Sequence, residues 1–453
     1  MANAKSFRVG KVQGYLRGKV WYLCYHDQGQ RRRPRVGTDR EQARQLAAQI
    51  NGQVEIGAPA ALSFEQISIP QLRDRWLEHH EQVLRSAVQT INRYRTATEH
   101  LLRFLGQRPV KHTSLFTASH VEAFVGYLRT VLVSPNGHAN TRKRPLMDKG
   151  IRFILEACQI LFNFAAKRRY LPPYAENPFQ VVNIDRIPIE NARSIVLMTA
   201  EQESLFLQDC DEWQLPVFAT LMFTGMRPGE LCHLLIEDLD LADGVVRVLN
   251  KPKIGWQVKT RNQREIPLLP ILVDLLKKQI DQRMNGPVFL RRKADTVNST
   301  KTSAQLERDL IVSVAVCEQI DGLTISRAKR LRLAKSVWHT AGAVDEDHIR
   351  KEFTRVAKKI GLLNSTAPKV LRHQFATILQ ESRVDPLVRN LLMGHASSES
   401  RNAGHGLGMT AVYTHTKLKT IREQLMDAFR ERPSVQAVTG RLQNEPHTAS
   451  AAK

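Results

Sequence analysis

Two breaks divide this 453-residue sequence into three stretches, and each stretch has its own hydrophobic pattern. Residues 57–67 begin with glycine, proline and alanine, a composition typical of a linker. Pro172, Pro173 and Pro178 end the second stretch, because proline cannot continue a helix. We therefore predict an N-terminal domain, a middle domain, a C-terminal domain and a disordered tail, over residues 1–56, 68–182, 190–432 and 433–453.

The first two stretches differ in the spacing of their apolar residues. Short β-prone runs separated by glycine turns predict a small sheet, and they cover residues 7–12, 19–26 and 31–36. Thr38 is expected to cap a helix over residues 40–52. In the middle stretch, apolar residues recur at helical spacing from about residue 69 to residue 179, which predicts a helical domain.

The third stretch mixes both patterns. Helices are expected over residues 213–224 and 268–284, and alternating residues predict strands over 245–248 and 257–267. The polar residues after 290 indicate a loop. The predicted fold class is multidomain and mainly α with small β-sheets: a β-rich N-terminal domain, a helical domain and a mixed α/β domain.

The charge of the chain indicates its kind of partner. A formal net charge of +23 and a pI of about 10.1 favour a polyanion, usually nucleic acid. Membrane surfaces and acidic proteins are the alternatives, but the charge is spread along the chain and no lipid anchor is visible. In the first stretch, Trp21 and Tyr22 lie near a basic run at residues 31–35, which suits DNA binding, although a solvated basic hairpin has the same composition.

Five scattered cysteines without paired spacing argue against a zinc site and against a disulfide framework. The N-terminus has no apolar segment of the signal-peptide kind, and no apolar run approaches the roughly 20 residues of a spanning helix. We therefore expect a cytoplasmic protein that uses no metal and no cofactor.

Two local patterns in the third stretch place cations at turns. In TGMRPGEL, an apolar helix ends at Gly225 and a new helix starts at Pro228, so Arg227 lies at a helix N-terminus, which attracts anions. In KTRNQREIPL, Lys259 lies at the tip of the expected hairpin, from which it can reach a leaving oxygen. Taken alone, a solvated arginine and a basic β-turn explain these patterns equally well or better.

Two further patterns follow in the last part of that stretch. Lys369 and Arg372 share a helix face beside the apolar residues of LRHQFAT, which fits a positioned anion clamp and a surface pair equally well. His395 follows Gly394 at the end of the apolar LLMG helix, and Tyr413 lies in AVYTH. A lone histidine or tyrosine is more often structural than catalytic.

Together, the four patterns resemble the tyrosine recombinase (phage integrase) family in their order and in their flanking residues. TGMRPGEL resembles the first arginine box of the family, and LRHQFAT resembles the second. LLMGH followed by AVYTH resembles the box that ends in the nucleophile. Residues 7–54 look like the arm-type DNA-binding domain of many integrases, and residues 68–180 are similar to the helical core-binding domain.

The resemblance implies a role for each residue. Arg227 and Arg372 would clamp the scissile phosphate, with Glu230 supporting the first arginine, and Tyr413 would be the nucleophile. Lys259 would be the hairpin lysine, and His395 would fill the histidine/tryptophan position.

The sequence departs from the family pattern at two places. Lys369 stands where the second box usually has a histidine, and its ordinary pKa of about 10.4 makes it a poor proton acceptor near neutrality. His395 and Tyr413 are separated by about twice the usual spacing, because SSESRNAGHGLG intervenes. That insertion offers His405 as a rival, but His395 is favoured because it follows the apolar helix end.

These residue types fit phosphodiester chemistry. Two arginines supply bidentate donors for the charge that develops on the phosphate, and Lys259 can protonate the leaving 5′ oxygen. A phosphotyrosyl ester stores the bond energy, so that rejoining needs neither ATP nor a metal.

We therefore expect a site-specific recombinase or integrase of a phage or other mobile element. It would act on double-stranded DNA as a homo-tetramer, with an accessory directionality factor as a further possible partner. The alternatives are a non-catalytic DNA-binding regulator of the same fold and a DNA-relaxing enzyme like type IB topoisomerase.

Overall fold

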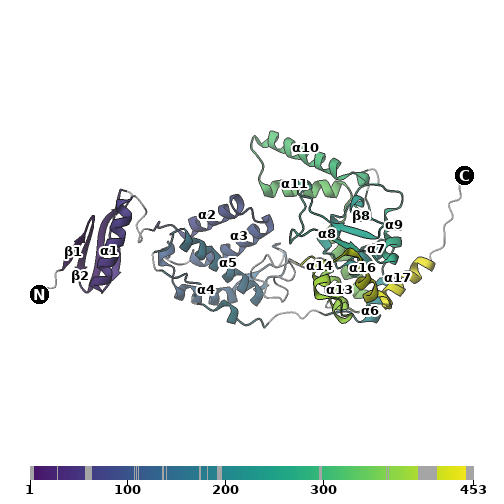
Figure 1. Cartoon of the computed structure of the whole chain (residues 1–453), viewed down its shortest axis with the longest axis horizontal. Coiled ribbons are helices and arrows are strands. Elements are labelled where there is room, and N and C mark those ends of the chain that lie inside the picture. Colours follow the sequence, from purple (N-terminus) through teal and green to yellow (C-terminus); the bar gives the residue numbers. More distant parts are fainter. Residues whose placement is uncertain are drawn as a thin grey trace. The chain divides into compact units, whose positions relative to one another are not determined.

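The computed structural model describes most of the chain: residues 5–27, 29–56, 64–106, 108, 110, 112–134, 137–138, 140–172, 175–180, 182–190, 196–294, 298–363, 365, 367–395 and 416–444. Internal contacts divide the chain into two compact units, Met1–Arg193 and Ser194–Lys453. Both are built mainly from helices with small sheets, which confirms the predicted fold class (Figure 1).

The first unit begins with an antiparallel sheet covered by one helix. The strands are β1 (Ser6–Val9), β2 (Val12–Arg17), β3 (Val20–Asp27), β4 (Gln30–Arg32) and β5 (Arg35–Gly37), and the helix is α1 (Arg40–Glu55). The sheet order is β1-β2-β3-β4, with β5 also paired to β3. Val12, Leu23 and Tyr25 from the sheet pack against Ala47 and Ile50 of α1.

Two local predictions for this part were wrong. Residues 7–12 do not form one strand, because Gly10 adopts a positive φ of 54° and turns the chain from β1 into β2. The helix is capped by Asp39 and not by Thr38: the Asp39 carboxylate accepts a hydrogen bond from the backbone N–H of Glu41 at 2.7 Å.

The rest of the first unit is a helical bundle with its own core. Its helices are α2 (Ile69–Gln82), α3 (Val88–Leu105), α4 (Ala118–Thr130) and α5 (Asp148–Lys167), with short 3₁₀ turns η1 (Thr113–Leu115) and η2 (Ile184–Arg186). A two-stranded hairpin of β6 (Leu132–Val133) and β7 (Arg144–Pro145) separates α4 from α5. Trp76, Phe104, Phe124 and Phe162 are fully buried between the helices, as the helical period predicts.

The second unit surrounds a small antiparallel sheet in the order β10-β9-β8, formed by β8 (Leu239–Asp240), β9 (Val245–Val248) and β10 (Arg264–Pro267). All eleven residues of α7 are buried beside it. The helices of this body are α6 (Ala200–Gln208), α7 (Gln214–Thr224), α8 (Pro228–Cys232), α9 (Pro270–Ile280), α12 (Glu346–Lys359), α13 (Lys369–Glu381), α14 (Pro386–Met393), α16 (Leu418–Phe429) and α17 (Pro433–Asn444), with 3₁₀ turns η3 (Ile236–Asp238), η4 (Pro252–Ile254) and η5 (Asn298–Thr300).

The predicted strand over residues 257–267 is shorter in the structure. Only β10 pairs with β9, in register from Arg264 opposite Val248 to Pro267 opposite Val245. Residues 249–263 form a long connecting loop instead, which includes η4 and a bridge between Lys251 and Trp256. Side chains of this loop satisfy backbone groups that a ladder would otherwise pair: Asn250 accepts from the Val258 N–H at 2.9 Å.

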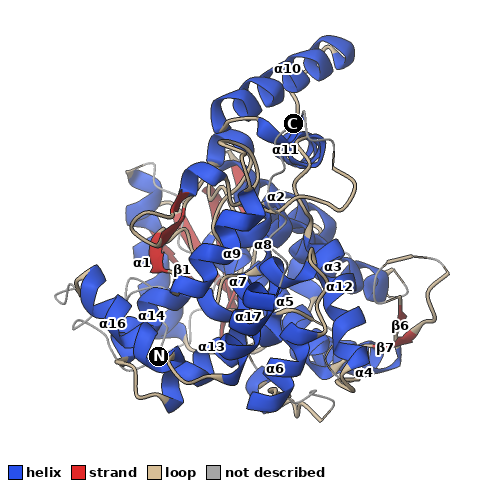
Figure 2. Cartoon of the chain, turned by 90° about the vertical axis from the view of Figure 1, so that its right-hand side faces the viewer, coloured by secondary structure: helices blue, strands red, loops and turns tan. Residues whose placement is uncertain are grey.

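A helical hairpin leaves the body between residues 290 and 343. It consists of α10 (Ser303–Asp321) and α11 (Arg327–Thr340), and of the described residues in the polar loop expected over residues 291–305, only the last three belong to an α-helix. Leu290 and Ala343 form an antiparallel bridge, so the hairpin leaves and re-enters the body at one place. Figures 1 and 2 show α10 extending away from the sheet of its unit.

The predicted disordered tail was wrong for residues 433–444, which form α17. Its Val438 side chain is fully buried, and the Ser434 hydroxyl donates to the buried Glu203 carboxylate of α6 at 3.1 Å. The mixed composition after Arg432 resembles that of a solvated tail, but Val435, Val438 and Leu442 lie at helical spacing and pack on the core.

Across the described ranges, no helix combines the length and the apolar character that crossing a lipid bilayer requires.

The role of α17 is testable by truncation. Ending the chain after Arg432 should lower the free energy of unfolding of the second unit by about 3 kcal/mol, because it exposes the pocket of Val438 and removes a hydrogen bond to Glu203. Urea unfolding measures the loss. Ending the chain after Asn444 is the control and should leave the midpoint unchanged; an equal midpoint for both truncations would contradict the packing.

Candidate active site

A buried carboxylate organises the candidate site. Glu230 of α8 has 1% of its side chain exposed, and its two oxygens meet two different arginines. Arg227 binds one oxygen through its guanidinium at 2.8 Å and the other through its backbone N–H at 2.9 Å. Arg264 reaches the second oxygen at 2.6 Å. Burial alone would raise the pKa of Glu230, but hydrogen bonds and charge from Arg264 and Arg227 hold it below its ordinary value.

The local sequence explains how Arg227 is held. It is the N-cap residue of α8 with extended backbone (φ −75°, ψ 147°), and Pro228 begins the helix, as TGMRPGEL predicts. The Glu230 carboxylate, at the third helical position, accepts the backbone N–H of the N-cap residue, as the glutamate of a capping box does. Arg227 is therefore tied to one carboxylate through both its backbone N–H and its guanidinium, and only 23% of its side chain is exposed.

Arg264 was not among the predicted site residues. It lies on β10, is 6% exposed, and also donates from Nε to the Leu392 carbonyl at 2.9 Å. Gly394 lies directly against it: a Cβ there would come within 2.7 Å of the guanidinium. The sequence held a partial signal, because Arg264 lies in the same KTRNQREIPL pattern as Lys259, on the strand expected after the hairpin tip.

Arg372 comes from α13 and is the most deeply buried of the predicted cations, with 6% of the residue exposed. Its guanidinium donates to the Gly225 carbonyl at 2.5 Å and to the Met393 carbonyl. These carbonyls end α7 and α14, so Arg372 joins three helices at their termini. Leu371, Phe375 and Leu379 are fully buried on the same helix, which confirms the predicted position of the arginine beside a core face.

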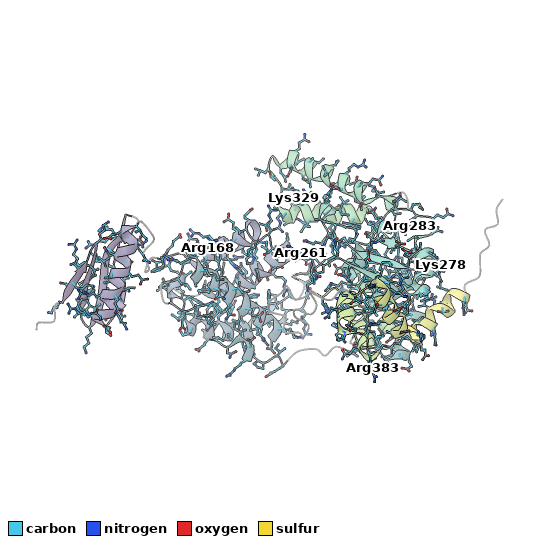
Figure 3. All side chains as sticks on the ribbon, in the orientation of Figure 1. Arg168, Arg261, Lys278, Arg283, Lys329 and Arg383 are labelled. Carbon is cyan, nitrogen blue, oxygen red and sulfur yellow. The ribbon has the colours of Figure 1, made fainter. Side chains whose placement is uncertain are left out.

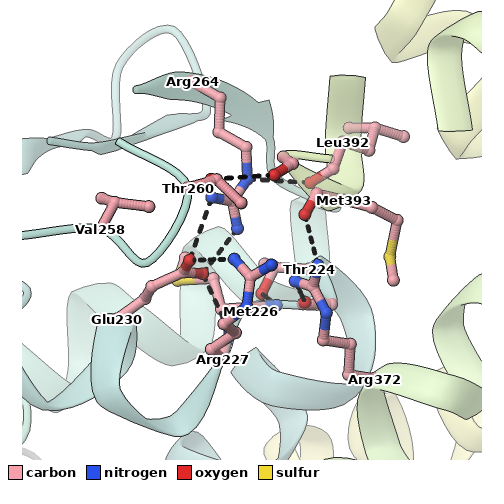
Figure 4. A network of polar contacts seen from close by, with 12 residues as sticks. Thr224, Met226, Arg227, Glu230, Val258, Thr260, Arg264, Arg372, Leu392 and Met393 are labelled. Carbon is pink, nitrogen blue, oxygen red and sulfur yellow. Dashed lines mark hydrogen bonds and ion pairs between the residues drawn. The ribbon is translucent and has the colours of Figure 1, made fainter. Parts of the chain in front are cut away.

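The cluster has an excess of positive charge. Figure 4 shows the guanidinium groups of Arg227 and Arg372 next to each other, with Arg264 above them and paired with Glu230. Burial and the neighbouring Arg227 lower the pKa of Arg372 to about 10, which leaves it charged at neutral pH. Among the residues that the structure describes, Arg227 and Arg264 share the Glu230 carboxylate, and Arg372 has no acidic partner. Three guanidinium charges against one carboxylate leave the cluster with a net surplus of two positive charges.

His395 lies beside this cluster. Gly394 ends α14 in the left-handed conformation, with φ 59°, and His395 follows it as predicted. Burial, and then the charges of Arg372 and Arg227, lower the pKa of His395. His395 also lines a cavity of about 410 Å³ with His373 and Thr377 of α13 and Arg389 and Asn390 of α14. His373 stands next to Arg372 in LRHQFAT but had no predicted role.

The two predicted lysines are exposed. Lys259 lies in the loop between β9 and β10, and within the described chain its side chain forms no hydrogen bond or ion pair. Its neighbour Thr260 donates to the Gly394 carbonyl at 3.1 Å, which ties this end of the loop to the residue before His395. Another lysine of this loop, Lys251, is paired with the buried Asp238 at 2.7 Å. Lys369 is the exposed first residue of α13.

The structure therefore brings Arg227, Arg372 and His395 together and adds Arg264 to them. Tyr413 and the rival His405 lie in residues 396–415, outside the described residues. Their roles stay predictions.

Three aromatic rings lie beside α8. His233 stacks on Trp256 with ring centroids 3.9 Å apart and planes 6° from parallel, and Trp338 of α11 meets His233 edge-on at 4.8 Å. The Nδ1 of His233 contacts the Gly229 carbonyl at 2.7 Å, and burial lowers the pKa of His233 to about 4. The neutral ring therefore donates this hydrogen bond near neutral pH.

Comparisons with known proteins show which proteins this chain is similar to. A family model described as the phage integrase family matches residues 197–314, which include Arg227, Lys259 and Arg264. Tyrosine recombinase XerC of Halalkalibacterium halodurans is 23% identical over 348 residues, which cover 75% of this chain and 90% of the relative. XerC of Thermodesulfovibrio yellowstonii is 28% identical over 227 residues. The chain is therefore similar to members of the tyrosine recombinase family.

The extent of the likeness varies within the tyrosine recombinase family. The match to the Thermodesulfovibrio XerC covers 50% of this chain and just over half, 57%, of that relative. A solved structure of the Tn1549 transposon integrase in complex with a circular intermediate DNA covers 79% of this chain and 99% of that chain. With 18% identity and a TM-score of 0.50, it shows a shared fold.

The buried carboxylate gives a stability prediction. Glu230→Gln should lower the free energy of unfolding by about 3 kcal/mol, because it leaves two partly buried arginines without their counter-charge. Glu265→Gln is the matched control: this half-exposed carboxylate pairs with Arg247 at 3.3 Å, and its loss should cost under about 1 kcal/mol. Urea unfolding of both variants measures the difference, and equal losses would contradict the organising role of Glu230.

The stacked histidine gives a pH prediction. His233 has a pKa of about 4 in the folded chain and about 6.5 when unfolded, so the unfolded chain takes up the proton first as the pH falls. The contribution of His233 to the free energy of unfolding is fully present above pH 6.5 and is lost as the pH falls towards 4. From pH 7 to pH 4.5, the wild type should lose about 2 kcal/mol relative to His233→Phe in urea unfolding. If the difference in free energy of unfolding between the wild type and His233→Phe does not change with pH, the His233 ring is not held neutral.

Proposed function

We propose that the chain is a site-specific DNA recombinase that cleaves and rejoins strands through a 3′-phosphotyrosyl intermediate. The observation that carries the proposal is the arginine cluster, in which three guanidinium groups face one carboxylate among the described residues and buried Arg372 has no acidic partner. A buried uncompensated charge is costly, so such a cluster suits a bound anion. The phosphodiester of DNA supplies that anion.

Arg227 and Arg372 are fixed by different contacts, and both can bind the same phosphate. Glu230 fixes Arg227, while the carbonyls of Gly225 and Met393 fix Arg372, so neither guanidinium needs to reorganise when the phosphate arrives. Each can donate two parallel hydrogen bonds to non-bridging oxygens. As the phosphorus becomes pentavalent, charge grows on these oxygens, and fixed donors stabilise it more than the ground state.

The remaining roles concern protons. Attack by the Tyr413 phenolic oxygen forms the phosphotyrosyl bond and breaks the bond to the 5′ oxygen, which then takes a proton from Lys259. His395 has a lowered pKa, so its neutral ring can accept the phenolic proton or donate a hydrogen bond to the phosphate. Lys369 can donate a hydrogen bond at the position of the usual histidine but not accept a proton near neutrality.

Binding of the duplex would involve both units. In the proposed arrangement, residues 1–56 bind arm-type sites, residues 68–182 bind core sites, and residues 190–432 carry the chemistry. The net charge of +23 supports a DNA partner, and Figure 3 labels basic side chains on both units: Arg168, Arg261, Lys278, Arg283, Lys329 and Arg383. The Tn1549 transposon integrase, which shares the fold, was solved with DNA. Synapsis by four protomers, help from a directionality factor and residence on a mobile element or viral genome complete the proposal.

Lys369 favours one rival function, a DNA-binding regulator that has lost catalysis, because it replaces the proton-shuttling histidine of the family pattern. The arginine cluster argues against it, since a regulator needs no buried anion site.

A nicked suicide duplex decides between the two. Cleavage near the nick releases a short fragment, which traps the protein on DNA as a covalent adduct. Wild-type chain should give the adduct on denaturing gels, and Tyr413→Phe should give none, because it lacks the attacking oxygen. Tyr94→Phe, in the helical bundle, is the matched control and should retain the adduct.

Absence of an adduct from the wild type on its own flanking DNA would support the regulator. Relaxation of supercoiled plasmids that lack any attachment site would instead support the topoisomerase-like alternative.

A further inference from the structure

The loop that carries Lys259 is fastened at several points. Asn250 donates to the Arg261 carbonyl at 2.8 Å and accepts from the Val258 N–H, which closes the loop near its end. Lys251 and Trp256 exchange two backbone hydrogen bonds of 3.0 Å, and the Lys251 side chain is paired with Asp238. These contacts fix the shape of the loop. Thr260 also ties the end of the loop to the Gly394 carbonyl at 3.1 Å, but none of these contacts links the loop to the helix that begins after Arg227.

The aromatic stack supplies that connection. Trp256 stands three residues before Lys259 and lies flat on His233, whose Nδ1 donates to the carbonyl of Gly229, two residues after Arg227. The indole also lies close to the backbone of α8: a Cβ on Gly229 would be 3.1 Å from the Trp256 ring. One stacked pair therefore joins the helix that begins after Arg227 to the loop of Lys259.

The third ring supports the stack from the helical hairpin. Trp338 of α11 is 4% exposed, meets the His233 ring edge-on, and donates from Nε1 to the Ile254 carbonyl of the loop at 2.9 Å. Ala334, one turn earlier on α11, lies directly under Gly255, where an added Cβ would come within 2.3 Å of it. The loop thus lies between α8 and α11 and contacts both.

On this basis, and resting on the proposed function, we propose that Trp256 and His233 are positioning residues that set the place of the Lys259 ammonium relative to the phosphate held by Arg227. Trp338 supports the stacked pair through its edge-on contact with the His233 ring. Proton transfer to a leaving oxygen depends steeply on distance, and a displacement of about 1 Å can cost on the order of 100-fold in rate. A flat contact at 3.9 Å between two rings leaves little freedom for such a displacement.

A sulfur-substituted substrate tests the proposal. In a suicide duplex with a 5′-bridging phosphorothiolate, the leaving group is a thiolate, which departs without taking a proton, so misplacement of Lys259 no longer matters. Trp256→Ala should cleave the ordinary duplex about 10- to 100-fold more slowly than the wild type and should return to near the wild-type rate on the sulfur duplex. Lys259→Ala should show the same rescue.

Three further variants separate positioning from general damage. Arg227→Ala should be slow on both duplexes, because the sulfur does not replace the phosphate clamp. Trp213→Ala removes a comparable tryptophan, edge-on to His348 at 5.0 Å and bonded to the Leu290 carbonyl, but away from the loop; its two rates should keep the wild-type ratio. Trp256→Leu, which keeps apolar volume but not the flat face, replaces the alanine variant if that variant fails to fold.

The outcomes are distinguishable. If Lys259→Ala is rescued by sulfur but the Trp256 variants are slowed equally on both duplexes, or not at all, the positioning role is wrong and the proposed function stands. If the wild type cleaves neither duplex, the proposed function fails and the positioning role falls with it.

Discussion

The pairing of one carboxylate with two arginines is the interaction on which the rest of the site depends. Glu230 lies at the start of α8, Arg264 on β10 and Arg227 at the junction with α7, so a single buried side chain ties the sheet to two helices. Removing one partner from such a group leaves an unpaired charge in the interior. This lowers the free energy of unfolding far more than the loss of a surface ion pair does. The site and the fold of this unit are therefore stabilised by the same contacts.

Arg372 is held by a different principle. Its partners are backbone carbonyls at the ends of α7 and α14, groups that have no hydrogen-bond partner within their own helices. Gly225 makes this possible, because its positive φ of 62° ends α7 and a Cβ there would come within 2.3 Å of Phe375. A neutral set of acceptors orients the guanidinium without cancelling its charge. That is the condition under which an anion still gains from binding there.

The sequence predicted what depends on local pattern and missed what depends on distant contacts. Helices at residues 213–224 and around Arg372, and the glycine turn before His395, follow from period and capping, and the structure has them. Arg264 was not predicted as a site residue, because its partners are distant in the sequence: Glu230 is 34 residues away and the Leu392 carbonyl is 128 residues away. The helix over residues 433–444 was not predicted, because composition alone suggested a solvated tail. Its partner Glu203 lies more than 200 residues earlier in the sequence.

The bridge between Leu290 and Ala343 has a consequence for how the chain can be changed. Because the two ends of the α10–α11 hairpin meet at one point, its outer turn around Gly322 can accept extra residues without altering the path of the main body. The inner part has no such tolerance, since Trp338 and Ala334 touch the loop. The hairpin thus combines a tip suited to attachment of labels or fused domains with a base whose packing reaches the reactive centre.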